Sequence, residues 1–359
     1  MAVGRVRPSV TALAAYRPGK AASQAEQEHG IAHAIKLASN ENPYEPAPSV
    51  VAAIQAAAGG VNRYSDHRAA ELRSRLAEWL GVSADQIAVG CGSVGLLQQL
   101  CLTYLDPGDE VVYPWPSFEA YPINVKMMAA VPVTTPLVDH VFDLDAVVAA
   151  VTPRTKLVML ATPNNPTGTA VSTTEIGSVL ERIPDDVVVL VDEAYREFSD
   201  PALGDPITDL LPVHRNVVVS RTFSKAYGLA GLRTGYVVAD VEIILELDKV
   251  LLAFASNMLA QVAGVAVLDA LDEIQPRIDL LLSERERVVG SLARMGWDLP
   301  DTKANFVYIP MGERSNEIHL ALETAGVVTR PFPGDGIRVT IGSPEENDRF
   351  LATLGEATA

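Results

Sequence analysis

The feature that most constrains the fold is a set of uninterrupted apolar runs in the middle of the chain. Residues 187–191 are all valine or leucine, and residues 216–220 enclose three consecutive valines. Strands that expose one face alternate apolar and polar residues, whereas uninterrupted apolar strands are buried on both faces and are typical of parallel sheets. Helical segments separate these runs. The sequence therefore predicts an α/β architecture, with helices on both faces of a mostly parallel sheet.

The predicted elements divide the 359 residues into three parts. We expect an N-terminal arm (1–40) that packs on the small domain, a large domain (41–245) and a small α+β domain (246–359). Strands are predicted at 87–89, 110–113, 156–161, 187–191, 216–220, 306–309 and 336–341, and helices at 93–105, 173–182, 241–270, 279–295 and from 345 onward.

Charge and cysteine content narrow the class of protein. The net charge of −17 disfavours nucleic acid and anionic membranes as partners. Two cysteines, Cys91 and Cys101, form neither a disulfide framework nor a zinc spacing. No apolar run is long enough for a membrane helix. We expect a cytoplasmic protein without a metal. The first 25 residues are basic and allow a transit peptide, but Pro8, Pro18 and Gly19 favour an extended arm.

Polar groups follow four of the predicted strands, at their carboxyl ends. These segments are 90–94, 162–168, 192–195 and 221–225. In an open parallel sheet, ligands bind beyond the carboxyl ends of the strands. We therefore expect the four segments to meet at one edge of the sheet and to form a binding site there.

The first segment allows more than one interpretation. Residues 90–95 match the Gly-x-Gly-x-x-Gly pattern of dinucleotide-binding enzymes. Such a site needs an acid at the end of the next strand, where this chain has Tyr-Pro-Trp at 113–115. An ordinary glycine turn is one alternative. The other, which we favour, is a turn that opens a helix whose Ser93 and Val94 N–H groups bind a phosphate.

A lysine follows the last apolar strand. Lys225 lies among small residues at the strand end, where burial favours the neutral amine. A neutral amine can attack an aldehyde, whereas an ammonium group cannot. Thr222, Ser224 and Arg233 lie close by in sequence and can bind the phosphate of the same ligand. The segment therefore predicts a lysine that forms a covalent bond with a phosphorylated aldehyde.

Residues 220–235 read Ser-x-x-x-Ser-Lys-x-x-Gly-Leu-Ala-Gly-x-Arg-x-Gly. This pattern resembles the Schiff-base motif of the fold-type I pyridoxal phosphate (PLP) aminotransferases, and the resemblance extends over most of the chain. It implies a large domain with a mostly parallel seven-stranded sheet and a smaller α+β domain. Residues 164–168 and 192–195 are similar to two other signatures of that family, residues 38–43 and 62–66 resemble the histidinol-phosphate aminotransferase branch, and residues 90–94, 115–122 and 344–348 look most like actinobacterial aromatic (phenylalanine) aminotransferases.

The resemblance implies a role for each residue around the cofactor. Lys225 would form a Schiff base with PLP and then act as general base in a ping-pong transamination. Asp192 would keep the pyridine nitrogen protonated. Asn165 and Tyr195 would donate to the phenolate oxygen, and Phe118 would stack on the ring. Considered alone, Asp192 is equally compatible with a helix N-cap and Asn165 with an Asx turn.

Further residues are implied around the phosphate and the substrate. Tyr64 would reach the cofactor phosphate of the partner subunit, so the enzyme would be a homodimer. Arg338 would bind the α-carboxylate of the substrate through its planar guanidinium, with support from Asn305. Without the resemblance, Arg338 would be assigned to a solvated strand face.

The substrate is less constrained than the reaction. Arg330 is available for the phosphate of histidinol phosphate, but Asp335 nearby would disfavour a dianion. Tyr16, Trp115, Phe118 and Tyr121 would line an aromatic pocket. We therefore predict transfer from aromatic amino acids to 2-oxoglutarate, with histidinol phosphate as the alternative donor. A PLP decarboxylase and a PLP-binding regulator are the rival classes.

Overall fold

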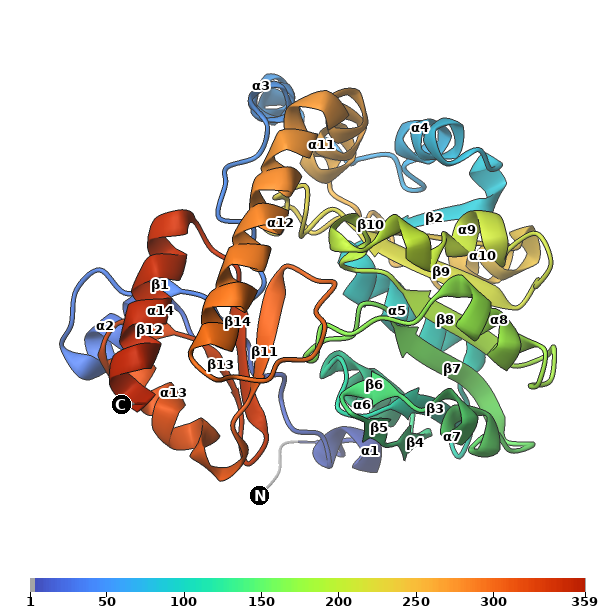
Figure 1. Ribbon diagram of the computed structural model, residues 1–359. Coiled ribbons are helices and arrows are strands. Elements are labelled where there is room, and N and C mark those ends of the chain that lie inside the picture. The colour runs from blue at the N-terminus through green and yellow to red at the C-terminus, as the bar shows by residue number, and fades with distance from the viewer. Residues whose placement is uncertain (1–3, 359) are drawn as a thin grey trace.

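The computed structural model describes residues 4–358, and its largest unit is a seven-stranded sheet (Figure 1). Five neighbouring strands are parallel, while β10 runs antiparallel to both of its neighbours. The predicted α/β fold with a mostly parallel sheet is confirmed. In spatial order the strands are β2 (Ile87–Gly90), β10 (Gly235–Ala239), β9 (Val217–Thr222), β8 (Val188–Asp192), β7 (Thr155–Ala161), β3 (Glu110–Pro114) and β4 (Val131–Thr135).

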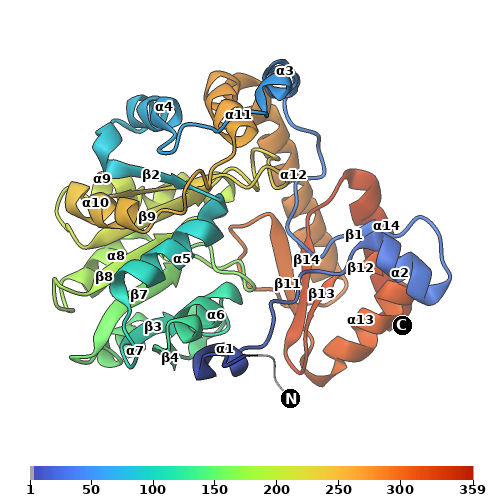
Figure 2. The same cartoon turned by 180° about the vertical axis from the view of Figure 1, so that it is seen from behind.

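Helices cover both faces of this sheet, which explains why its central strands lack polar alternation. Every residue of β8 and β9 is buried. Helix α5 (Gly92–Tyr104) lies on one face and α8 (Thr173–Leu180) on the other, as the two opposite views show (Figure 2). A capping box in which Ser172 and Glu175 bind each other's backbone N–H starts α8.

The C-terminal part forms a smaller α+β unit beside the large sheet (Figure 1). Its three-stranded antiparallel sheet has the order β11-β14-β13. The elements of this unit are α12 (Leu271–Arg294), β11 (Phe306–Pro310), α13 (Ser315–Thr324), β12 (Val327–Val328), β13 (Arg330–Phe332), β14 (Gly336–Thr340) and α14 (Pro344–Thr358).

Two sequence expectations about secondary structure were wrong. The helix predicted over 241–270 is broken into α10 (Val241–Lys249) and α11 (Met258–Asp269), because Asn257 starts a new helix by accepting a hydrogen bond from the Ala260 N–H. The helix predicted at 279–295 begins earlier, at Leu271. Strands β4, β10 and β13 were not anticipated.

The N-terminal arm contacts both units of the molecule. Its short helix α1 (Pro8–Thr11) lies against α6 (Ala120–Met127), whereas α2 (Ala22–His29) packs against α13 (Figure 2). Strand β1 (Ile35–Lys36) then pairs in parallel with β12. The chain between the two helices has no regular structure, as predicted for an extended arm, whereas α1 and α2 are helical.

The remaining elements pack around the two sheets. Helices α3 and α4 both lie against α11 (Figure 1). Within residues 4–358, no helix has both the length and the apolar character needed to cross a lipid bilayer. The elements not yet given are α3 (Pro48–Ala57), α4 (Ala70–Leu80), β5 (Leu137–Val138), β6 (Val141–Phe142), α7 (Leu144–Ala149), α9 (Pro206–Asp209) and the 3-10 turns Ala58–Gly60, Ala84–Gln86, Arg196–Phe198, Pro201–Leu203 and Gly312–Arg314.

Candidate active site

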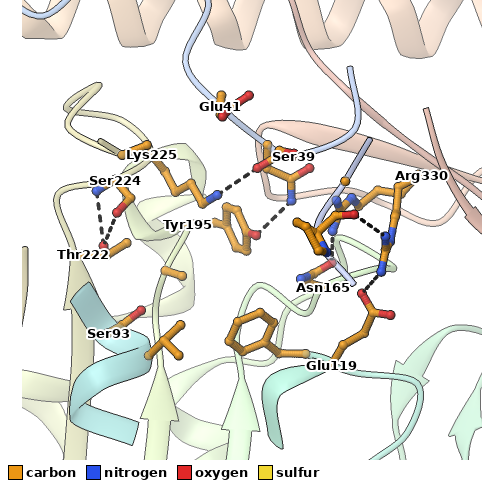
Figure 3. A pocket seen from close by; sticks show the side chains of 18 of the residues that line it. Ser39, Glu41, Ser93, Glu119, Asn165, Tyr195, Thr222, Ser224, Lys225 and Arg330 are labelled. Carbon is orange, nitrogen blue, oxygen red and sulfur yellow. Dashed lines mark hydrogen bonds and ion pairs between the residues drawn. The ribbon is translucent and has the colours of Figure 1, made fainter. Parts of the chain in front are cut away.

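A cavity of about 420 Å³ lies at the carboxyl ends of the parallel strands, where the four loop segments were expected to meet. The N-terminal arm, the large sheet and the small unit all contribute to its wall (Figure 3). The predicted site residues that line this cavity are Tyr16, Ser93, Val94, Phe118, Asn165, Asp192, Tyr195, Thr222, Ser224, Lys225, Arg233 and Arg338.

Three predicted site residues are not among those that line the cavity. Trp115 lies outside it, against the edge of Tyr113. Asn305 is buried behind it, where its Nδ2 donates to the Asn40 carbonyl at 3.2 Å. Tyr64 lies on the surface with 83% of its area exposed, so it does not contribute to this cavity within one chain.

Lys225 follows β9 and is held half-buried at the cavity wall. Its Nζ donates to the Ser39 carbonyl at 3.1 Å (Figure 3). Burial, followed by the positive charge of Arg338, lowers the pKa of the Lys225 amine to about 7. A substantial fraction of this amine is therefore neutral and nucleophilic at neutral pH.

Asp192 is the last residue of β8, and its two carboxylate oxygens have different surroundings. Its Oδ2 accepts a hydrogen bond from the Tyr121 hydroxyl at 2.9 Å, whereas Oδ1 is buried without a partner. Burial raises the pKa of Asp192 to about 6, although Tyr121 and the Ala194 N–H oppose the rise. Because Asp192 lines the cavity, the unpartnered oxygen can accept a proton-bearing group of a ligand.

Hydrogen-bond donors for an anion gather at the first turn of α5. Ser93 and Val94 lie at this helix N-terminus, where the backbone N–H groups favour negative charge. Thr222 ends β9 and Ser224 lies in the loop after it, and their hydroxyls are 3.0 Å apart. The Arg233 guanidinium donates to the Ser224 hydroxyl at 3.3 Å. Together these groups form a cradle for a phosphate.

The cradle requires glycine at two positions. Gly92 has φ +70°, and a Cβ there would lie 2.6 Å from the Arg233 Nη2. Gly235 brings β10 close to α5, since a Cβ there would lie 2.7 Å from the Ser93 nitrogen. Arg233 itself has φ 60°, a left-handed conformation that is unfavourable for a residue with a side chain. A side chain at Gly92 would therefore meet Arg233, and one at Gly235 would meet the first turn of α5.

Arg338 lies on β14 and brings a guanidinium from the small unit into the cavity. It donates to the Asn165 side-chain oxygen and, at 2.7 Å, to the Ala38 carbonyl. Its Nε is buried without a partner, and burial lowers the pKa of the group. These neutral partners leave the positive charge uncompensated by a carboxylate, which suits the binding of a ligand carboxylate.

Sequence reasoning assigned no role to Asn40, which holds parts of the site together. The Nδ2 of Asn40 donates to the Tyr195 hydroxyl at 2.9 Å, and its backbone N–H donates to the Thr340 hydroxyl. Asn40 has φ 53° and is almost fully buried. Its place in the Ala-Ser-Asn-Glu-Asn-Pro motif was the only available signal. Asn40 thus links the arm to both the large and the small sheet.

Two expectations about the pocket were wrong. Tyr121 does not line the cavity but is fully buried beneath it, where it binds Asp192. Asp335, expected to disfavour a dianionic substrate, is not among the lining residues. The acid that faces Arg330 is Glu119, whose Oε2 lies 2.6 Å from the Arg330 Nη2.

The comparisons with known proteins agree with this geometry. The family model for aminotransferase class I and II matches residues 32–354. The aromatic amino acid aminotransferase of Mycolicibacterium vanbaalenii is 47% identical over 97% of this chain and 96% of its own length. The aromatic amino acid aminotransferase of Rhodococcus opacus is 48% identical over 97% of this chain and 94% of its own length.

Solved structures share the fold over nearly the whole chain. The histidinol-phosphate aminotransferase from Sinorhizobium meliloti, solved in complex with pyridoxal-5'-phosphate, superimposes with a TM-score of 0.92. It is 30% identical, and the match covers 99% of this chain and 98% of that one. The resemblance seen in the sequence is confirmed, and the chain belongs to the class I and II aminotransferase family.

Proposed function

We propose that this protein is a PLP-dependent transaminase that transfers the amino group of aromatic amino acids to 2-oxoglutarate. The observation that carries the proposal is the position of Lys225. Its amine has a lowered pKa and lines the same cavity as the unpartnered oxygen of Asp192 and the guanidinium of Arg338. Relatives 47–48% identical to this chain bear the name aromatic amino acid aminotransferase.

The cavity residues fit PLP on grounds that do not depend on the relatives. The phosphate cradle suits the phosphate group, and the unpartnered Oδ1 of Asp192 suits a protonated ring nitrogen. The Lys225 amine is suited to bind the aldehyde carbon, and Phe118 offers a ring face at the cavity wall. When bound, PLP supplies an electron sink that stabilises negative charge on the substrate Cα.

The residues of the chain then supply binding and proton transfer. Arg338 holds the α-carboxylate of the amino acid with its two-pronged guanidinium. Lys225, once its nitrogen is free and neutral, would take the proton from the substrate Cα and deliver it to the carbon that carried the cofactor aldehyde. Asp192 is mostly ionised at neutral pH, since its pKa is about 6, and it holds the proton on the ring nitrogen.

An aromatic side chain is supported by the lining beside Arg338. Phe118 and Tyr16 present rings to the cavity. Arg330, the cation that a phosphate ester would need, is already paired with the carboxylate of Glu119. A substrate whose side chain is uncharged leaves this pair undisturbed, whereas a phosphate ester would have to displace Glu119 from Arg330.

We further propose a cytoplasmic homodimer in which Tyr64 reaches the cofactor phosphate of the partner subunit. In the single chain, the Tyr64 ring stacks on Phe254 with centroids 4.4 Å apart, yet 83% of its area is exposed. Val61 and Leu252, also strongly exposed, lie close to this pair in sequence. Large exposed apolar side chains of this kind are typical of protein interfaces.

The test is a panel of amino donors with 2-oxoglutarate as acceptor and PLP present. We expect phenylalanine, tyrosine and tryptophan to give the highest kcat/KM and histidinol phosphate a much lower one. The Lys225→Ala variant should lose turnover and the absorbance band of the lysine-bound cofactor. A higher kcat/KM for histidinol phosphate would identify that ester as the donor instead. Release of CO₂ without an oxo acid would indicate a decarboxylase.

A further inference from the structure

An ion pair occupies the side of the cavity that faces away from Lys225 (Figure 3). Arg330 begins β13 and Glu119 immediately precedes α6, and their closest nitrogen and oxygen atoms are 2.6 Å apart. Both residues line the cavity. The Arg330 side chain is 14% exposed and that of Glu119 is 39% exposed, so the acid is the better-solvated partner.

Arg330 is also the direct neighbour of Arg338 across the small sheet. Strands β13 and β14 pair antiparallel, with Arg330 opposite Arg338. Residues opposite each other in an antiparallel pair project their side chains from the same face. Two adjacent guanidinium groups therefore line the cavity, and of these two only that of Arg330 is paired with a carboxylate.

This arrangement sets the charge that the cavity can accept. Arg338 has only neutral partners and can bind one ligand carboxylate. With Glu119 in place, Arg330 is neutralised, and the adjacent space suits a side chain without charge. A guanidinium held in a planar ion pair can also pack against an aromatic ring. The paired state therefore matches an aromatic amino acid, which has a single carboxylate.

A dicarboxylate substrate needs the state in which Arg330 is free of Glu119. Transfer to 2-oxoglutarate requires the same cavity to accept a second carboxylate at the end of the side chain. Arg330 is the cation beside Arg338 that could bind it, but only if Glu119 releases the guanidinium. Glu119 can leave because it is the better-solvated partner, with 39% of its side chain exposed, so its carboxylate returns to water when it releases the guanidinium. Arg330 would remain positioned, since its Nη1 also donates to the Pro18 carbonyl of the arm at 3.4 Å.

We propose that Glu119 is a specificity-determining residue that competes with the distal carboxylate of a dicarboxylate substrate for Arg330. With an aromatic substrate Glu119 keeps Arg330 neutral, and with glutamate or 2-oxoglutarate the substrate carboxylate replaces it. This inference rests on the proposed function and adds to it how one cavity serves both kinds of substrate. Glu119 acts through Arg330 and takes no part in the chemical steps.

The experiment measures single-turnover half-reactions of the PLP-loaded enzyme with glutamate and with phenylalanine. Each is followed by the change in cofactor absorbance, so the two substrates are compared separately. Glu119→Gln keeps the size of the side chain and removes its charge. We expect the glutamate-to-phenylalanine ratio of second-order rate constants to rise about fivefold, the factor that a partly exposed pair can contribute. Arg330→Met should lower the same ratio at least tenfold, because the rate constant for glutamate should fall while that for phenylalanine stays the same.

Glu41 provides a matched control within the same cavity. It lines the cavity, is 47% exposed and pairs with Lys36 at 2.8 Å rather than with Arg330. Glu41→Gln removes the same charge from the cavity but frees Lys36, which is not the strand neighbour of Arg338, so it should leave the substrate ratio unchanged. Equal rises in the two glutamate-to-phenylalanine ratios would show a general charge effect and would overturn the role of Glu119.

The outcomes separate this inference from the proposed function. If the wild-type enzyme reacts with phenylalanine but Glu119→Gln leaves the ratio unchanged, the inference fails and the function stands. If the wild-type enzyme does not react with phenylalanine at all, both fail. If Arg330→Met slows both substrates equally, the ion pair is only a structural link between β13 and α6. Thermal denaturation of each variant checks that it is folded.

Discussion

The lowered pKa of Lys225 can be measured directly and tests the physical basis of the site. With a pKa of about 7, about half of the Lys225 amines are neutral at pH 7. An ordinary lysine, with a pKa near 10.4, has only about one amine in 2,500 neutral at that pH. Since only the neutral amine reacts with an electrophile, Lys225 should be modified at far lower pH than other lysines.

The assay is trace acetylation of cofactor-free protein with acetic anhydride over a series of pH values. Mass spectrometry of the Lys225 peptide gives the extent of modification, with the exposed Lys249 as internal reference. The midpoint of the pH curve reports the pKa and does not depend on how easily the reagent enters the cavity. We expect a midpoint about 7 for the wild-type protein.

A substitution then separates the two causes of the shift. Burial is the larger cause, and the charge of Arg338 adds to it. Arg338→Met leaves the burial and removes the charge, so the midpoint should rise by about one unit. A wild-type midpoint above about 9 would refute the claim that the amine is desolvated. A midpoint that does not move in Arg338→Met would refute the electrostatic contribution.

Two further predictions concern the phosphate cradle and the arm. Gly92→Ala should weaken PLP binding at least tenfold in a spectroscopic titration, because its Cβ would meet the Arg233 guanidinium; Gly81→Ala has the same φ of +70° but open space, and should bind normally. Burial raises the pKa of Glu323, but hydrogen bonding, led by that from Lys20, outweighs burial and holds it below its ordinary value. Its ionised form therefore stabilises the fold at neutral pH, and Glu323→Gln should lose about 2 kcal/mol in urea unfolding at pH 7. The difference from wild type should shrink as the pH falls below about 4.5, and a constant difference would contradict this reasoning.

The part of the site that sequence reasoning found is the part that the sheet imposes. Asp192 ends one apolar strand, and Lys225 follows another by a few residues. The rule that parallel strands present their carboxyl ends together was therefore enough to bring the two groups into one cavity. Arg338, which lies on the other sheet, was located only through the resemblance to a family.

The part that sequence reasoning missed depends on contacts between distant segments. Glu119 and Arg330 are separated by 211 residues, and nothing in either local sequence indicates that they meet. Tyr121 looked like a pocket aromatic, yet α6 turns its ring into the core beneath Asp192. Asp335 is only five positions after Arg330, but the turn between β13 and β14 carries it away from the cavity.

The antiparallel strand β10 has a consequence for how the molecule is made. It lies between β2 and the rest of the large sheet, so β2 joins the sheet through β10 alone. During synthesis on the ribosome, residues 87–90 emerge long before residues 235–239, and β2 must wait for them without a partner. The first turn of α5 and the lysine loop can therefore come together only late in translation, and a chain interrupted before Gly235 would possess most of the sheet but no cradle for the cofactor.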